Sequence, residues 1–190
     1  MPCADTAEAM SGDVRTALTE ALQESELRAI RSLMDAAFGT GEEAFADDDW
    51  QHALGGTHFM LEDGDVIVSH ASVVQRALEI GGRPFRTGYV EAVATAPDRQ
   101  GSGYGTAVMR AATKHIRATF ELGALGTGAH GFYERLGWET WRGPASVRTA
   151  GGEQRTSDEE GYILVLRTLS SPPFDLDDAI SCDWRPGDVW

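Results

Sequence analysis

The stretch Arg99–Gly105, which reads Arg-Gln-Gly-Ser-Gly-Tyr-Gly, is the feature that most constrains the fold of this chain. An apolar run, Val90–Thr95, precedes it, and a pattern typical of an amphipathic helix, Tyr104–Phe120, follows it. A strand, a glycine-rich turn and a helix in this order bring several backbone N–H groups together at the positive end of the helix dipole. The sequence therefore predicts a turn that binds an anion such as phosphate.

Two common phosphate motifs do not fit this turn. The ATP-binding P-loop needs a lysine before the hydroxyl residue, whereas here Gly105 precedes Thr106. A dinucleotide fingerprint needs Gly-x-Gly-x-x-Gly, and the glycines here are Gly101, Gly103 and Gly105. Antiparallel hairpins are also expected before the turn, unlike the parallel units of a Rossmann fold. A third pattern, Gln/Arg-x-x-Gly-x-Gly/Ala, matches Gln100, Gly103 and Gly105 without adjustment.

That third pattern is the signature of the GNAT superfamily of N-acetyltransferases, which this chain resembles. Further along, Gly131–Trp138 reads Gly-Phe-Tyr-Glu-Arg-Leu-Gly-Trp and resembles the fourth helix of the superfamily. The resemblance implies a GNAT fold of the mixed α/β class, with a central, mostly antiparallel twisted sheet flanked by helices. The order of patterns agrees, since a helix, hairpin strands and then alternating strands and helices indicate one mixed α/β domain.

The periodicities place the elements of this domain, which we expect to span residues 14–190 after a disordered tail at residues 1–13. Val14–Leu22 is ambiguous between helix and strand, and we favour a short edge strand. We expect loops over the acidic segment Thr40–Asp49 and over Arg142–Glu160. Helices are expected over Ser25–Phe38, Tyr104–Phe120 and Gly128–Leu136, and further strands over Thr57–Leu61, Val66–Leu78, Phe85–Thr95, Leu122–Leu125, Trp138–Trp141 and Tyr162–Leu166.

The composition limits the kinds of molecule that this chain is expected to bind. A net charge of −14 makes nucleic acid a poor partner, because binding it needs a basic face. The charge fits two readings, plain solubility or a cleft that attracts a polycationic ligand. No apolar run approaches the ~20 residues of a membrane span, and no secretory core is present, so we expect a cytoplasmic protein. Cys3 and Cys182 lack the spacing of a metal site, and no metal is expected.

A closer resemblance covers most of the chain. Leu54–His58, Gly88–Glu91, Leu122–Leu125 and above all the tail Cys182–Trp190 resemble the aminoglycoside 2′-N-acetyltransferases. This resemblance implies an acyltransferase that moves an acetyl group from acetyl-CoA to the 2′-amino group of an aminoglycoside antibiotic, which confers resistance. It also implies a homodimer.

The resemblance implies roles residue by residue. It places acetyl-CoA against Val93, Ala94, Thr95, Gln100, Gly101, Ser102, Gly103, Tyr104 and Gly105. It places the substrate against Glu43, Glu91, Ala92, Gly126, Asp158, Glu159, Asp188 and the carboxylate of Trp190. Two departures concern the substrate. Glu43-Ala44-Phe45 stands where the family has Gly-Asp-Phe, and Gly126-Thr127-Gly128 shortens a serine-rich stretch. These departures leave open that the substrate is an unusual aminoglycoside, including kasugamycin, which also carries a 2′-amine.

The expected reaction is direct attack of an amine on the thioester, which needs a neutral amine, a stabilised oxyanion and a protonated leaving thiolate. Glu91, acting through water, is the candidate base, and Tyr133 is the candidate acid. The backbone N–H of Val93 is the candidate oxyanion donor, and Trp190 joins this catalytic group through its carboxylate. His70 alternates with apolar residues and reads as a packed strand residue, so no histidine is expected as the base.

The tail is expected to form an anionic wall. Asp183, Asp188 and the terminal carboxylate lie close in sequence to Trp184 and Trp190, and they could bind substrate ammonium groups. Simpler readings remain for each residue: a tail that only packs, a Tyr133 of the core, and a Glu91 that only holds substrate.

Two other functions compete with this one. The first is acetylation of a protein N-terminus or of lysine, which would need an open peptide groove. The second is a non-catalytic acetyl-CoA-binding module, which would keep the glycine turn without needing Tyr133 or Glu91.

Overall fold

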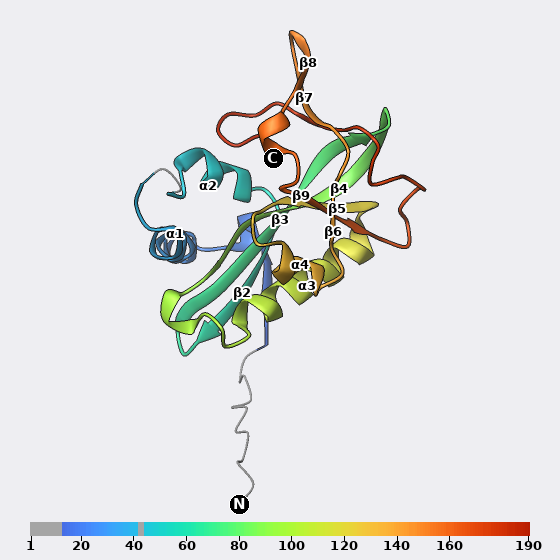
Figure 1. Ribbon diagram of the computed structural model, residues 1–190. Helices are drawn as coiled ribbons and strands as arrows, with labels where there is room; N and C mark the ends of the chain where they lie inside the picture. The colour runs from blue at the N-terminus through green and yellow to red at the C-terminus, as the bar shows by residue number, and fades with distance from the viewer. Residues whose placement is uncertain (1–12, 42–43) are drawn as a thin grey trace, which may run out of the picture.

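A computed structural model of the chain describes residues 13–41 and 44–190. The expected disordered tail and Glu43 therefore lie outside the described residues, apart from Asp13. The described part is one mixed α/β domain in which helices cover a strongly curved sheet (Figure 1). The strands are β1 Arg15–Leu18, β2 Thr57–Asp63, β3 Val66–Ile80, β4 Arg83–Thr95, β5 Leu122–Gly126, β6 Glu139–Thr140, β7 Ala145–Thr149, β8 Gly152–Arg155, β9 Ile163–Arg167 and β10 Ile180–Asp183. The helices are α1 Glu24–Phe38, α2 Asp47–Ala53, α3 Tyr104–Thr119 and α4 His130–Glu134, with short 3₁₀ turns η1 Thr19–Ala21, η2 Pro97–Arg99 and η3 Ser157–Glu159.

The sheet confirms the expected topology. Its order is β6-β9-β5-β4-β3-β10-β7-β8, and the β1–β2 pair adds to β3 beside β10. Neighbouring strands run antiparallel, except that β4 and β5, and β7 and β10, run parallel. The hairpins β2–β3–β4 lead directly into the glycine turn, as the sequence predicts. No helix among the described residues is long and apolar enough to cross a membrane.

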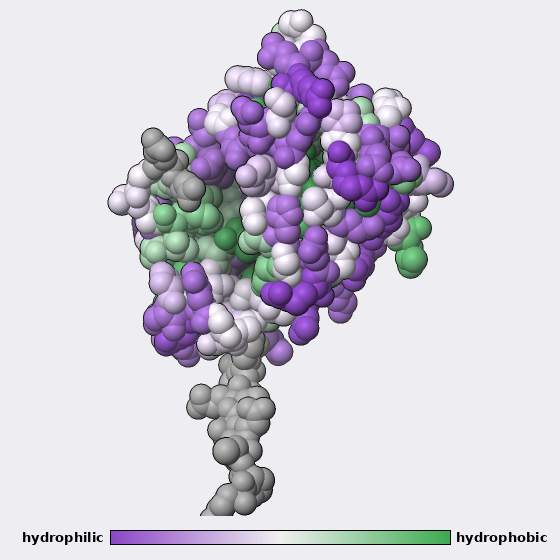
Figure 2. Space-filling view, viewed as in Figure 1, coloured by the Kyte–Doolittle hydropathy of each residue, from purple (hydrophilic) through white to green (hydrophobic). Residues whose placement is uncertain are grey.

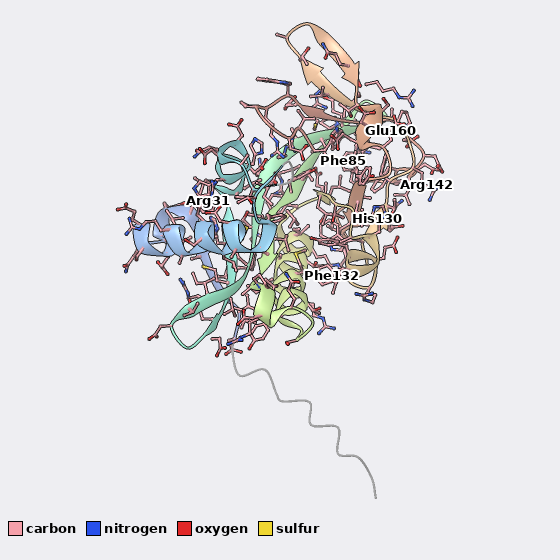
Figure 3. The ribbon with its side chains drawn as sticks, turned by 60° about the vertical axis from the view of Figure 1, so that its left-hand side comes forward. Arg31, Phe85, His130, Phe132, Arg142 and Glu160 are labelled. Carbon is pink, nitrogen blue, oxygen red and sulfur yellow. The ribbon has the colours of Figure 1, made fainter. Side chains whose placement is uncertain are left out.

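The two faces of the sheet carry separate cores, because side chains alternate along a strand. On β2, Phe59 and Leu61 belong to the core formed with α3 and α4, whereas Met60 belongs to the core formed with α1. Figure 1 shows α1 and α2 on one side of β2–β4 and α3 and α4 on the other. In the turned view of Figure 3, Arg31 lies on the α1 side and Phe132 on the side of α3 and α4.

The strands β4 and β5 separate partway along their length, and this opening positions the site. They pair only from Thr87 to Tyr89, against Leu122 to Ala124, although β4 continues to Thr95. Beyond Tyr89 the two strand edges diverge and leave room between them.

Two segments expected as loops contain regular structure. In the acidic segment 40–49, α2 begins at Asp47, because three aspartates in the first turn suit the helix N-terminus and Asp49 Oδ2 accepts from the Ala46 N–H at 2.9 Å. In the segment 142–160, the alternation of buried Ala145 and Val147 with more exposed neighbours supports the β7–β8 hairpin. The tail also adds β10, which lies between β3 and β7. The other expected helices and strands are confirmed within a few residues.

Candidate active site

A first cavity, of about 570 Å³, lies where β4 ends and α3 begins. We call it the glycine-loop cavity. Its lining consists of Val93, Ala94, Thr95, Arg99, Gln100, Gly101, Gly103, Gly105, Thr106, Ala129, Phe132, Tyr133 and Arg135. Most of the residues that the resemblance assigns to acetyl-CoA are thus brought together. Ser102 and Tyr104 belong to the same turn but are not among the lining residues.

The backbone of the turn is shaped for close approach. Gly101 and Gly103 have φ angles of 76° and 89°, a region that favours glycine, and Gly103 caps α3. A Cβ on Gly105 would lie 3.1 Å from Thr95 Oγ1, so the helix start packs tightly on the end of β4. Gln100 Nε2 donates to the Thr95 carbonyl at 3.2 Å and fixes the turn to the strand. The N-terminus of a long helix therefore faces an open cavity, an arrangement that suits phosphate groups.

Two arginines add positive charge to this cavity. Arg99 already pairs with Asp63 at 3.0 Å and with Asp98 at 2.8 Å. Arg135, which follows α4, lines the cavity from the other side and was not assigned a role from the sequence. The sequence could have indicated Arg135 as a site residue, because Arg135 lies within the aromatic motif that contains Tyr133.

A second cavity, of about 460 Å³, lies on the other side of the β4–β5 opening. We call it the tail cavity, because the C-terminal segment forms one wall. Its lining consists of Phe38, Phe45, Asp49, His52, Tyr89, Val90, Glu91, Ala92, Val93, Leu125, Gly126, Thr127, Gly128, Ala129, Tyr133, Arg185, Asp188 and Trp190. Figure 2 shows apolar surface gathered in a hollow between the α1–α2 region and the α3–α4 region of Figure 1.

Glu91 is buried in the tail cavity and forms an ion pair there. Its Oε1 accepts from Arg185 Nη1 at 2.5 Å, and the two side chains are only 13% and 14% exposed. Arg185 Nε also donates to the Asp188 carbonyl at 2.7 Å. Burial raises the pKa of Glu91, and the charge of Arg185 opposes that shift. The sequence analysis missed Arg185, because it considered only the acidic groups of the tail motif.

The end of the tail is held inside the domain. Trp190 Nε1 donates to Thr156 Oγ1 at 2.9 Å, and the Trp190 backbone N–H donates to Asp188 Oδ1 at 3.2 Å. A Cβ on Gly126 would lie 3.2 Å from the main-chain carbonyl carbon of Trp190. Gly126, Asp188 and Trp190 therefore meet, as the resemblance implies.

The prediction that Asp183 belongs to the anionic wall is wrong. Asp183 pairs with Arg148 at 2.9 Å, outside the residues that line either cavity, and Trp184 is 59% exposed. The reason is β10, whose pairing separates Asp183 from the last residues of the tail. Asp158 and Glu159 lie on η3 and do not line the tail cavity, although burial, Asp188 and Asp158 raise the pKa of Glu159.

The helix α2 supplies site residues that the sequence analysis missed. Asp49 and His52 lie one turn apart on α2 and both line the tail cavity. Burial and the charge of Arg185 lower the pKa of His52, so its imidazole is neutral at neutral pH. The sequence analysis, which expected no histidine as the base, did not consider His52, because it treated residues 40–49 as a loop and left α2 unassigned.

The two cavities share a wall formed by Val93, Ala129 and Tyr133, which line both. Burial raises the pKa of Tyr133 to about 12, so its phenol keeps its proton at neutral pH. The packed reading of His70 is confirmed, since its ring is fully buried. A cavity whose backbone suits phosphate and a cavity lined by several carboxylates thus meet at a strand edge and at a protonated hydroxyl.

Comparison with known proteins agrees with this arrangement. The family described as "Acetyltransferase (GNAT) domain" matches residues 19–141. An aminoglycoside 2′-N-acetyltransferase of Mycolicibacterium fortuitum is 38% identical over 198 residues, covering 100% of both chains.

Solved structures share the fold. A GNAT family acetyltransferase from Brucella melitensis in complex with acetyl-CoA has a TM-score of 0.59 and 18% identity, over 85% of this chain and 92% of that one. A GNAT family N-acetyltransferase from Escherichia coli in complex with CoA has a TM-score of 0.61 and 12% identity, over 90% and 91%.

The chain belongs to the GNAT acetyltransferases and, within them, to the family of the aminoglycoside 2′-N-acetyltransferases. It is an acyltransferase that moves an acetyl group to an amine. This assignment decides against the non-catalytic binding module that the glycine turn alone left open.

Proposed function

We propose that this enzyme transfers the acetyl group of acetyl-CoA to the 2′-amine of an aminoglycoside. The observation that carries the proposal is the meeting of two unlike cavities at Val93 and Tyr133. The similarity to an aminoglycoside 2′-N-acetyltransferase over the whole chain supports the acceptor. A kasugamycin-type 2′-amine is the alternative acceptor, since Ala44 stands where the family has aspartate.

The glycine-loop cavity fits the acetyl donor. The N–H groups of Gly101, Gly103 and the first turn of α3 would bind the pyrophosphate, and the edge of β4 from Val93 to Thr95 would bind the pantetheine arm. When bound, acetyl-CoA supplies the thioester. Arg135 would add charge to the phosphate end.

The tail cavity fits a polycationic acceptor. Its lining includes the carboxylates of Asp49, Glu91 and Asp188, and Arg185 neutralises one of them. Aromatic walls from Phe38 and Phe45 would exclude water from a bound sugar ring. Contacts of Glu43, Asp158 and Glu159 with the acceptor stay predictions, as does the role of the Trp190 carboxylate.

Val93 and Tyr133 of the shared wall, together with a base in the tail cavity, would perform the proton and charge chemistry. The Val93 N–H would stabilise the negative charge that develops on the thioester oxygen. Tyr133 would give its proton to the sulfur as the C–S bond breaks and the N–C bond forms. Glu91, through water, would take the proton that the amine loses, and neutral His52 is the second candidate for that role.

A steady-state assay tests the acceptor. The assay uses acetyl-CoA with two aminoglycosides that differ only in carrying an amine or a hydroxyl at position 2′. We expect acetyl transfer to the amine and none at 2′ of the hydroxyl compound, with the position read by NMR of the product. Equal products from both compounds, or transfer only to a peptide N-terminus or lysine, would contradict the proposal.

Assembly is proposed on the resemblance, and location on the expectation stated in the sequence analysis. We propose a cytoplasmic homodimer. Light scattering coupled to size-exclusion chromatography tests the dimer, which would appear at twice the mass of 20.5 kDa.

A further inference from the structure

The residue before the proposed oxyanion donor has an unusual backbone. Ala92 has a φ of 50°, the only positive φ of a non-glycine residue in the described ranges. It lies in a bulge of β4, because the register passes from Ser72 opposite Glu91 to His70 opposite Ala94. Such a conformation is strained for a residue with a Cβ and persists only where its surroundings hold it.

Buried side chains of β3 hold this bulge. Where the bulge interrupts the ladder, carbonyl groups of β4 accept hydrogen bonds from side chains instead, and each donor side chain belongs to a fully buried residue. The bonds are Ser72 Oγ to the Glu91 carbonyl at 3.2 Å, His70 Nδ1 to the Ala92 carbonyl at 2.7 Å and Ser69 Oγ to the Ala94 carbonyl at 3.1 Å.

The hydrogen bond from His70 to Ala92 ends a series of hydrogen bonds, and the donor and the acceptor of the His70–His58 bond follow from it. The Ala92 carbonyl can only accept, so His70 Nδ1 carries the proton and His70 Nε2 must accept from His58 Nδ1, 2.9 Å away. His58 Nε2 is then the acceptor that faces Thr19 Oγ1 at 2.8 Å, and this hydroxyl also lies 3.2 Å from the Gly56 carbonyl as a second acceptor. Thr19 Oγ1 itself accepts from the Gly55 N–H at 2.9 Å. Burial lowers the pKa of His58 to about 4 and that of His70 to about 3, so both rings are neutral.

This series of hydrogen bonds determines where the Val93 N–H points. In a trans peptide the C=O of one residue and the N–H of the next point in opposite directions. The Ala92 carbonyl points into the sheet toward His70, so the Val93 N–H points away from it, toward the β4–β5 opening. We propose that His70 is a positioning residue, which His58 and Thr19 hold in one tautomer so that it fixes the Ala92–Val93 peptide plane for catalysis. This inference rests on the proposed role of the Val93 N–H.

Two substitutions of His70 test the inference by kinetics. His70→Leu removes the donor, whereas His70→Asn keeps an amide N–H near the position of Nδ1. We expect His70→Leu to lower kcat at least about tenfold, because small misplacements of reacting groups are costly, with both KM values within about twofold. His70→Asn should recover most of kcat. His115→Leu, at a half-buried histidine of α3 away from the bulge, is the matched control and should keep kcat.

NMR of histidine ¹⁵N in the unsubstituted enzyme gives a readout that does not depend on folding of a variant. We expect both His58 and His70 as neutral Nδ1–H tautomers, with ring N–H protons that exchange slowly. His70 found as the Nε2–H tautomer would overturn the inference.

The kinetic outcomes separate the two proposals. An active wild-type enzyme with an equally active His70→Leu variant would overturn this inference alone. A wild-type enzyme that acetylates no amine would overturn the proposed function and this inference with it.

Discussion

The glycine-loop cavity and the tail cavity differ in how the chain builds them. Most of the glycine-loop cavity comes from one continuous stretch, 93–106, and the groups that we propose to bind phosphate are backbone N–H groups. The tail cavity collects α1, α2, β4, β5 and the C-terminal segment, and its central ion pair joins residues 94 positions apart. A site made of backbone groups depends on local geometry, whereas a site made of side-chain charges depends on long-range packing.

This difference predicts that each cavity can be damaged separately. Changes at the residues of the tail cavity that hold the acceptor should alter stability and acceptor binding, and changes in the glycine turn should alter acetyl-CoA binding. The chemical step should respond to the proposed acid, base and oxyanion donor and to the residues that position them. Four predictions test this separation.

The largest effect is expected from breaking the buried ion pair. Arg185→Met leaves Glu91 charged and buried without its partner, which should lower the free energy of unfolding by about 3 kcal/mol. Denaturant unfolding measures the loss, and the acetyl-CoA Kd should stay within about twofold. Arg142→Met, which breaks exposed pairs with Asp175 and Asp177, is the control and should lower the free energy of unfolding far less, because water screens exposed charges. Equal losses of unfolding free energy in the two variants would contradict the claim that burial makes the Glu91–Arg185 pair important for stability.

The next effect concerns the shared wall. Tyr133→Phe removes the proposed acid and should lower kcat about 100-fold, while the affinities for acetyl-CoA and aminoglycoside change little. Rapid-quench kinetics and calorimetry separate these quantities. Tyr162→Phe, at a tyrosine that is 52% exposed, should leave the rate unchanged. An unchanged rate in Tyr133→Phe would remove this residue as the acid.

A smaller effect is expected in the glycine turn. Gly105→Ala places a Cβ 3.1 Å from Thr95 Oγ1, so the turn must shift by a few tenths of an ångström. We expect acetyl-CoA to bind about fivefold more weakly, or about 1 kcal/mol, with the aminoglycoside KM unchanged. Gly151→Ala meets only Thr149 Oγ1 at 3.6 Å and should change neither constant. A variant that weakens aminoglycoside binding instead would show that the two cavities are not separate.

The smallest effect concerns the pH dependence of kcat, which should stay unchanged through pH 10.0. Tyr133 acts as an acid only while protonated, and burial raises its pKa from 10.0 to about 12. The fall in kcat on the alkaline side should therefore move upward, and the rate should not drop through pH 10.0. A pH–rate profile measures this, and a midpoint near 10.0 would place the phenol in water rather than in the wall.

The sequence sufficed where local chemistry determines the structure. The glycine turn and α3 follow from spacing and composition, whereas the aromatic motif of Tyr133 was found through the resemblance, and the structure places them together. Glu91, Gly126, Asp188 and Trp190 were found through the resemblance, and they do meet in one cavity.

The residues that sequence reasoning missed depend on tertiary contacts. Arg185 can be assigned to the site only once the tail packs beside β4 and the ion pair with Glu91 forms. The run Asp47–Asp49 is typical of a loop in sequence, but in the structure it forms the first turn of α2. Asp183 was misplaced because β10 adds a strand that no periodicity predicted. His70 was interpreted only as a packed strand residue, because its hydrogen bond to His58 becomes visible only when β2 and β3 pair.

The central claim is that donor and acceptor occupy two cavities at once and react across the shared wall. Initial rates measured over a matrix of acetyl-CoA and aminoglycoside concentrations test it most directly. Direct attack in a ternary complex predicts double-reciprocal lines that intersect. Parallel lines would indicate a covalent acetyl-enzyme formed before the acceptor binds, and they would contradict the claim.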